Sequence, residues 1–190
     1  MEREIRIGTA RGPLNLPDGV TVKPDDGEIR VEGPVNCEGD AVFEGTLIAT
    51  SLSADGTVEV KGDLLLEEDA EVAQSLRVTG RIEAGGPLDV GGSLRCSSLK
   101  AGSLDVGGSA RVYGELEADR VDVGGSMRAG DTEVLELEAR GSVVLKTLRA
   151  AEVRVGGVLR CSGDLKAEVL DVGGSVDIAG SAAFTRAYIG

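Results

Sequence analysis

The sequence predicts an all-β, single-domain parallel β-helix, or β-solenoid, with three short strands per coil and about ten coils. Three observations predict this fold. One nine-residue motif returns every 16–18 residues after a first interval of 21, each unit alternates apolar and polar residues, and turn residues separate the alternating segments. A unit of this length cannot bury a core by itself, so neighbouring units must stack to share one.

The repeat divides the chain into two regions. Residues 1–13 precede the first copy and are expected to form an N-terminal strand or cap, and residues 14–190 are expected to form the β-helix domain. Clear copies are LDVGGSLRC at 88–96 and LDVGGSARV at 104–112. In the same register, the units start at Leu14, Val35, Leu52, Ala70, Leu88, Leu104, Val121, Leu137, Val153, Leu170 and Ala187.

Each unit holds three apolar-polar-apolar triplets, which in one unit are 88–90, 94–96 and 99–101. Alternation with period two is typical of short strands that bury one face. The Gly91-Gly92 pair is expected to supply the positive φ of a sharp corner. The side chains expected to point inward are Leu88, Val90, Leu94, Cys96, Leu99 and Ala101, and those expected to point outward are Asp89, Arg95 and Lys100.

One inward column is expected to hold small side chains. Ala101, Ala118, Ala150 and Ala167 each precede the next unit, with Val134 as the exception. Small residues let the walls of the solenoid approach closely, so we expect no internal ligand cavity.

The composition argues against an enzyme. The chain has no histidine, which excludes Ser-His-Asp and Cys-His nucleophile systems and imidazole zinc ligands. The recurrent Gly-Gly-Ser is followed by a further strand, whereas a phosphate-binding loop leads into a helix. We therefore expect no catalytic residues, no cofactor and no metal site. The net charge of −13 and the four aromatic residues also argue against a nucleic-acid partner.

Cysteine usage and the first residues indicate a cytoplasmic protein. The three cysteines, Cys37, Cys96 and Cys161, are far apart in the sequence and fall at inward positions, so we expect them to pack in the core. No segment has the roughly 20 apolar residues of a membrane span. The charged start, MEREIRIG, does not resemble a secretory signal.

Outward charges form columns of one sign. An arginine column is formed by Arg77, Arg95, Arg111, Arg128 and Arg160, and an acidic column by Asp89, Asp105, Asp122, Glu138 and Asp171. The arginine column is a candidate binding strip for a counter-charged partner, such as an acidic lipid surface. The alternative is a solvated face, whose charges are balanced by neighbouring columns and by salt.

On the L-x-V-x-G-x-L units of 16–18 residues between residues 14 and 190, the chain resembles the bactofilins. This resemblance implies a right-handed β-helix and nucleotide-independent, end-to-end assembly into non-polar filaments. It also implies a cytoskeletal role in cell shape or as a scaffold, with other cytoskeletal or membrane-associated proteins as further partners. Many bactofilins carry disordered tails and an N-terminal membrane-targeting stretch. Here the repeats begin by about Leu14 and run to the last residue, so we expect no direct membrane span, and membrane attachment would need a partner or a surface strip.

Two other classes share the fold. One is a monomeric β-solenoid that serves as a binding or adhesin module. The other is a relative of the hexapeptide-repeat acyltransferases, whose coils hold close to 18 residues and whose usual mechanism needs a histidine base. The drift of the repeat and the absence of histidine argue against the second class.

The ends of the solenoid are the predicted self-assembly surfaces. An open end exposes unpaired strand edges and core side chains. Phe184 falls in the alanine column of the final coil, with Tyr188 and Ile189 close by, and Ile5 and Ile7 lie on a strand at the other end. The alternative is that Phe184 plugs the core as a cap.

Overall fold

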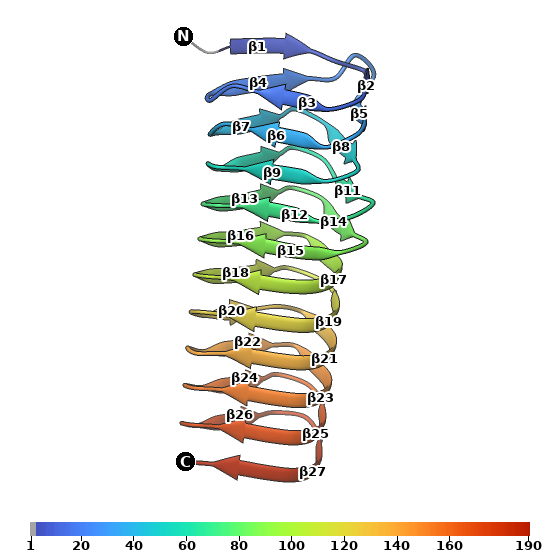
Figure 1. The fold of residues 1–190 in the computed structure, drawn as a ribbon. Coiled ribbons are helices and arrows are strands. Elements are labelled where there is room, and N and C mark those ends of the chain that lie inside the picture. The colour runs from blue at the N-terminus through green and yellow to red at the C-terminus, as the bar shows by residue number, and fades with distance from the viewer. Residues whose placement is uncertain (1–2) are drawn as a thin grey trace.

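The computed structural model describes residues 3–190, which form a stack of parallel strands without a helix (Figure 1). Eleven strands pair in one of the sheets, so the chain makes eleven coils rather than about ten. The additional coil arises because β1 (Arg3–Arg6) pairs in parallel with β4 (Val20–Lys23), before the repeat becomes recognisable. The coils wind right-handed, and the two ends of the chain lie at opposite ends of the stack (Figure 1).

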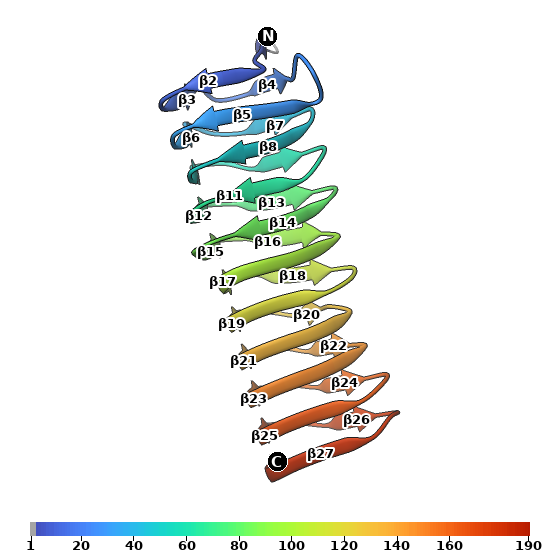
Figure 2. The ribbon, with the colours of Figure 1, turned by 90° about the vertical axis from the view of Figure 1, so that its right-hand side faces the viewer.

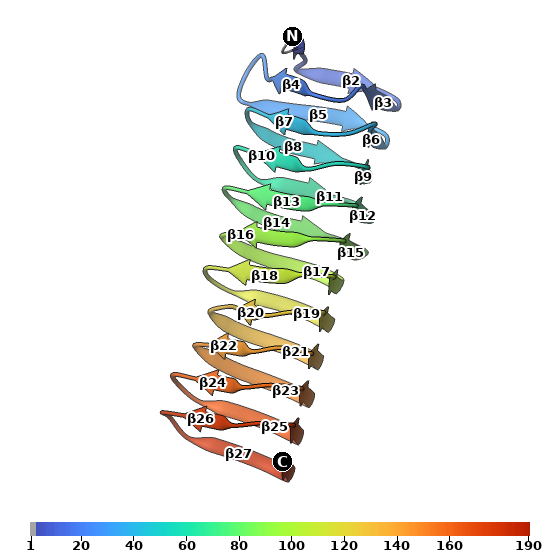
Figure 3. The ribbon, with the colours of Figure 1, turned by 90° about the vertical axis from the view of Figure 1, so that its left-hand side faces the viewer.

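Each coil passes over three faces, which we number in chain order. The first face begins with β2 (Thr9–Arg11), β5 (Glu28–Glu32), β8 (Thr46–Ala49), β11 (Leu64–Leu66) and β14 (Arg81–Ala84). The second face begins with β3 (Leu14–Leu16), β6 (Val35–Cys37), β9 (Leu52–Ala54), β12 (Ala70–Val72) and β15 (Pro87–Val90). Figure 2 shows the first face and Figure 3 views the stack from the opposite side.

From residue 98 onward, one longer strand per coil bends to supply both of these faces. These strands are β17 (Ser98–Val106), β19 (Leu116–Val123), β21 (Asp131–Ala139), β23 (Thr147–Val155), β25 (Leu165–Val172) and β27 (Ala182–Ile189). In β17 the bend falls at Gly102 and Ser103, which are both half-buried and interrupt the alternation. Two triplets therefore join into one strand in the C-terminal half of the solenoid.

The third face is a single sheet that runs the length of the molecule. In addition to β1 and β4 it contains β7 (Ala41–Phe43), β10 (Val58–Val60), β13 (Ser75–Val78), β16 (Ser93–Cys96), β18 (Ser109–Val112), β20 (Met127–Arg128), β22 (Val143–Leu145), β24 (Leu159–Cys161) and β26 (Val176–Ile178).

The predicted side-chain directions are confirmed. Leu88, Leu94 and Leu99 are buried, as are Val90, Cys96 and Ala101. Asp89, Arg95 and Lys100 are exposed. Successive coils keep this register, since Asp89 pairs with Asp105 and Asp105 with Asp122. Period-two alternation thus places one continuous apolar core inside the three faces.

The predicted backbone conformation of Gly91 and Gly92 is wrong. Among the described residues, positive φ occurs only at Gly12, Gly19 and Gly27. The corner glycines favour close stacking instead, because a Cβ at Gly91 would lie 2.1 Å from the carbonyl oxygen of Ala73 in the preceding coil.

Candidate functional site

The last coil is the most exposed strand region of the molecule. All eight residues of β27 are exposed, including those in inward columns. Phe184 pairs in register with the buried Ala167, and Ile189 pairs with the buried Val172, yet Phe184 is 42% and Ile189 57% exposed. β27 pairs with β25 on one side, and no described strand pairs with its other side. The end therefore presents a free strand edge and uncovered core positions.

The predicted assembly residues are divided between the two ends. The structure places Phe184, Tyr188 and Ile189 together on β27, with Tyr188 58% exposed. Ile5 and Ile7 are partly buried against the core at the opposite end. Among the described residues, β1 pairs with β4 alone and β2 with β5 alone. Both ends thus carry strand edges that can accept further strands.

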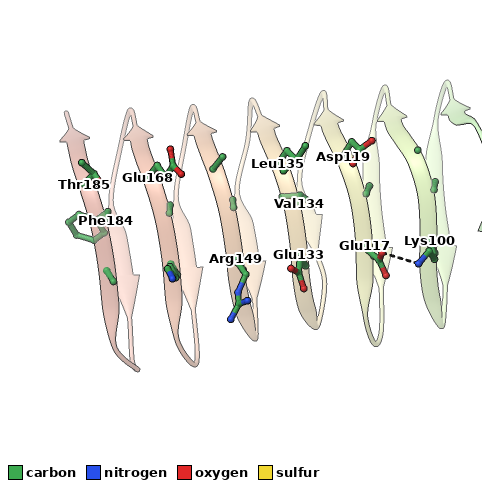
Figure 4. A pocket seen from close by; sticks show the side chains of 18 of the residues that line it. Lys100, Glu117, Asp119, Glu133, Val134, Leu135, Arg149, Glu168, Phe184 and Thr185 are labelled. Atoms are coloured by element: carbon green, nitrogen blue, oxygen red, sulfur yellow. Dashed lines mark hydrogen bonds and ion pairs between the residues drawn. The ribbon is translucent and has the colours of Figure 1, made fainter.

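The alanine column is buried but is the least enclosed part of the core. Ala101, Ala118, Ala150 and Ala167 are 5–9% exposed, whereas Leu104 in a neighbouring inward column is 1% exposed. These alanines lie where each long strand bends, and a methyl group is too short to fill the bend. A longitudinal groove of about 890 Å³ therefore runs over them and reaches Phe184 (Figure 4).

Charged side chains border this groove along the first face. Lys100 Nζ lies 2.9 Å from Glu117 Oε1, and this contact raises the pKa of Lys100 (Figure 4). Glu133 and Arg149 continue the same row, and Leu135, 59% exposed, stands on the other side of the groove. This groove was not predicted from the sequence. The sequence signal that could have indicated it is Leu135, an apolar residue at an outward position.

The arginine column, called the arginine row below, is a surface row on the third face that Val144 interrupts once. The strand register aligns Arg77, Arg95, Arg111 and Arg128, followed by Val144, Arg160 and Asp177. The row borders a shallow groove of about 600 Å³ that is also lined by Ser75, Ser93, Ser109, Ser126 and Ser142. The Ser75 and Ser93 hydroxyl oxygens are 3.0 Å apart, so these serines hydrogen-bond between coils.

The acidic column, called the acidic row below, lies on the second face. The register aligns Glu71, Asp89, Asp105, Asp122, Glu138, Arg154, Asp171 and Tyr188. Partial burial raises the pKa of Asp89, and the carboxylates of Asp105, Glu71 and Asp69 raise it further. The row therefore carries like-charge repulsion that the fold does not relieve.

Ion pairs within the chain occur elsewhere. Lys100 pairs with Glu117, Lys146 with Asp131, and Lys61 with Glu44. Within residues 3–190, no ion pair involves the five arginines of the arginine row or the acids of the acidic row. Arg154, the cation within the acidic row, contacts Glu152 of its own strand.

The cysteines occupy the predicted inward positions. Cys37, Cys96 and Cys161 are free and buried. Burial raises the pKa of the Cys37 and Cys96 thiols to about 12. Neutral thiols at these positions act as small apolar side chains in the core.

The described residues form a β-solenoid with an unpaired strand edge at each end and two rows of opposite charge. No protein-family model, curated protein or solved structure matches the chain. Among residues 3–190, no helix has the length and hydropathy needed to cross a membrane.

Proposed function

We propose that this protein is a structural, polymer-forming protein that assembles end to end through its terminal coils. The single observation that carries this proposal is the uncovered last coil. In β27 the inward columns continue, but no described strand covers them. A second copy stacked on this edge would supply the missing hydrogen bonds and bury the exposed apolar side chains.

The chemistry of the C-terminal edge supports a contact between copies. Phe184, Tyr188 and Ile189 place three large apolar side chains on one strand, in a molecule that has only four aromatic residues. A contact between two such edges is self-complementary, and so is a contact between two N-terminal edges at Ile5 and Ile7. Alternation of the two contacts gives a filament without polarity.

The proposed biological role is that of a cytoskeletal filament or scaffold in the cytoplasm, independent of nucleotides and without catalysis. Stacked strands supply the assembly energy through backbone hydrogen bonds and apolar burial, so the contact needs no bound nucleotide or metal. The resemblance of the repeat to that of bactofilins supports this role. A scaffold of this kind also offers its three long faces to other proteins.

Light scattering of the purified chain tests end-to-end assembly. At micromolar concentration and about 500 mM NaCl, which screens contacts between exposed charges, wild type is expected to have a mass of many copies. Phe184→Arg is expected to lower that mass to a monomer or dimer, because a charge within the contact cannot be paired. Tyr113→Arg is the matched control, since Tyr113 is 65% exposed but lies in the interior of the stack, and it should assemble as wild type does.

A monomeric wild type would overturn the proposal. Identical monomers of wild type and Phe184→Arg would instead support the alternative in which Phe184 caps a single solenoid that works as a binding module. In that case the groove of about 890 Å³ over the alanine column becomes the candidate site.

A further inference from the structure

We propose that the arginine row of one copy binds the acidic row of a second copy, so that two solenoids associate side by side. The arginine row is Arg77, Arg95, Arg111, Arg128 and Arg160, and the acidic row is Glu71, Asp89, Asp105, Asp122, Glu138 and Asp171. This contact uses the second and third faces and does not depend on the ends.

Neither row is neutralised within the described part of the chain. The first face and the coil edges contain ion pairs between neighbouring coils, such as Lys100 with Glu117 and Lys146 with Asp131. The two single-sign rows contain no such pair among the described residues, apart from Arg154 with Glu152. Stacking like charges about 5 Å apart is unfavourable, and an opposing row of the other sign relieves this repulsion in both copies.

The charges have the same spacing in both rows. Successive coils place one charge about every 4.8 Å along each row, since this is the distance between paired strands. A second copy carries the same spacing over the same length. A B-form DNA strand has its phosphates at a different spacing, and the protein's net charge of −13 also opposes binding to a nucleic acid or an anionic membrane.

The interruptions of the two rows also match. Asp177 reverses the sign of the arginine row, and Arg154 reverses the sign of the acidic row one coil earlier. Two parallel copies offset by one coil therefore bring five pairs of opposite charges face to face without a like-charged pair. The pairs are Arg95 with Glu71, Arg111 with Asp89, Arg128 with Asp105, Arg160 with Glu138, and Asp177 with Arg154.

An antiparallel arrangement also matches. It places Arg154 opposite Glu59, which precedes Arg77 in its row, and again avoids like-charged pairs. Its other pairs are Arg77 with Glu138, Arg95 with Asp122, Arg111 with Asp105, and Arg128 with Asp89. A parallel arrangement without an offset is less favourable, because Arg160 then opposes Arg154 and Asp177 opposes Asp171.

The shapes of the two faces allow the rows to meet. Serines flank the arginines and line a shallow groove of about 600 Å³ along the third face. Glycines such as Gly91, Gly107 and Gly124 follow the acids on the second face. With small residues beside both rows, the short carboxylates can reach the guanidinium groups.

Charge-reversal complementation tests the proposal. The arginine-row reversal is Arg95→Glu, Arg111→Glu and Arg128→Glu, and the acidic-row reversal is Asp89→Arg, Asp105→Arg and Asp122→Arg. Both are made in the Phe184→Arg background, so that a failure of end-to-end assembly does not affect the result. One tagged protein captures an untagged one at about 50 mM and about 500 mM NaCl.

The unreversed background protein is expected to capture itself at low salt and at least about tenfold less at high salt. Each reversal alone should not capture itself, because its two rows then carry the same sign. A mixture of the two reversals should recover capture. Phe184→Arg changes the net charge from −13 to −12. The arginine-row reversal lowers it to −18 and the acidic-row reversal raises it to −6. Both partners are therefore negative, and overall attraction cannot explain recovery.

A matched control reverses three acids of the first face instead, with Glu83→Arg, Glu117→Arg and Glu133→Arg. This protein has the same net charge as the acidic-row reversal, and it is expected to capture itself as the background protein does. Circular dichroism verifies that each variant retains its β-structure. The proposal is overturned if the mixture fails to recover capture or if the control loses it. Binding of the unreversed protein to anionic vesicles, without recovery in the mixture, would assign the arginine row to a lipid surface instead.

A single pair then determines the orientation of the two copies. Arg154→Asp should weaken capture about two- to fivefold. In a mixture, Asp177→Arg restores capture if the copies are parallel, and Glu59→Arg restores it if they are antiparallel. If neither substitution restores capture, the proposed pairing of the rows is wrong.

Discussion

Two successive coils at the C-terminal end of the solenoid carry similar residues in very different surroundings. Leu170 and Val172 of β25 are fully buried, whereas Ala187 and Ile189, which pair with them on β27, are exposed. The backbone and the register are the same in both coils. The difference is a neighbour, because β25 has a coil on each side and β27 has one. Burial in this fold is therefore a property of stacking, and the described strands leave an unpaired edge at each end.

The largest expected difference between interior and terminal coils comes from a charge in the core. Leu104 and Ala187 belong to the same inward column. Leu104→Asp should lower the free energy of unfolding by at least about 3 kcal/mol, because it buries an unpaired carboxylate. Ala187→Asp should change it by less than about 0.5 kcal/mol in the monomer. Urea denaturation in the Phe184→Arg background measures both, and equal effects would contradict the difference between the two coils.

A methyl group at a corner should have a smaller effect. A Cβ at Gly107 would lie 2.3 Å from the carbonyl oxygen of Gly91, whereas at Gly190, the last residue of that column, the nearest atom is 3.9 Å away. Ala73 and Arg140 occupy the same column, so the coils can adjust to a side chain. We expect Gly107→Ala to cost about 1 kcal/mol and Gly190→Ala to be neutral in urea denaturation. A neutral Gly107→Ala would show that close stacking does not select glycine here.

The smallest expected effect concerns charge in the acidic row. Because neighbouring acids and partial burial raise the pKa of Asp89, its ionised form destabilises the fold. Asp89→Asn should therefore raise the free energy of unfolding by a few tenths of a kcal/mol at pH 7, after screening by solvent. The gain should disappear as the pH falls through the folded-state pKa, where Asp89 becomes protonated.

The control for this prediction is Glu117→Gln. Glu117 accepts a hydrogen bond from Lys100, so its neutralisation should not stabilise the protein. If both substitutions have the same effect on urea denaturation, the acidic row is no more strained than the first face.

Much of the fold could be predicted because its information is local. Alternation within triplets such as 94–96 sets which side chains face inward, and the repeat sets the register of Asp89, Asp105 and Asp122. The role of the corner glycines could not be predicted in this way, because their close contacts are with the preceding coil. The groove over the alanine column depends on the bend within the long strands, and triplet patterns do not encode that bend.

The candidate surfaces were predictable to a similar degree. The assembly residues at the C-terminal edge follow from Phe184 falling in a column of alanines. The arginine row also follows from the repeat, but its lack of internal partners depends on side-chain positions that a sequence pattern does not contain. Charges on the first face look similar in sequence, yet Lys100 and Glu117 pair there within the chain.

Electron microscopy of the purified chain tests the central claim, that the open ends join, most directly. One solenoid of eleven coils is about 50 Å long at the spacing of paired strands. Wild type at micromolar concentration is expected to form filaments many times this length, and Phe184→Arg should form single or paired rods. Wild-type fields that contain only isolated rods of about 50 Å would contradict the claim.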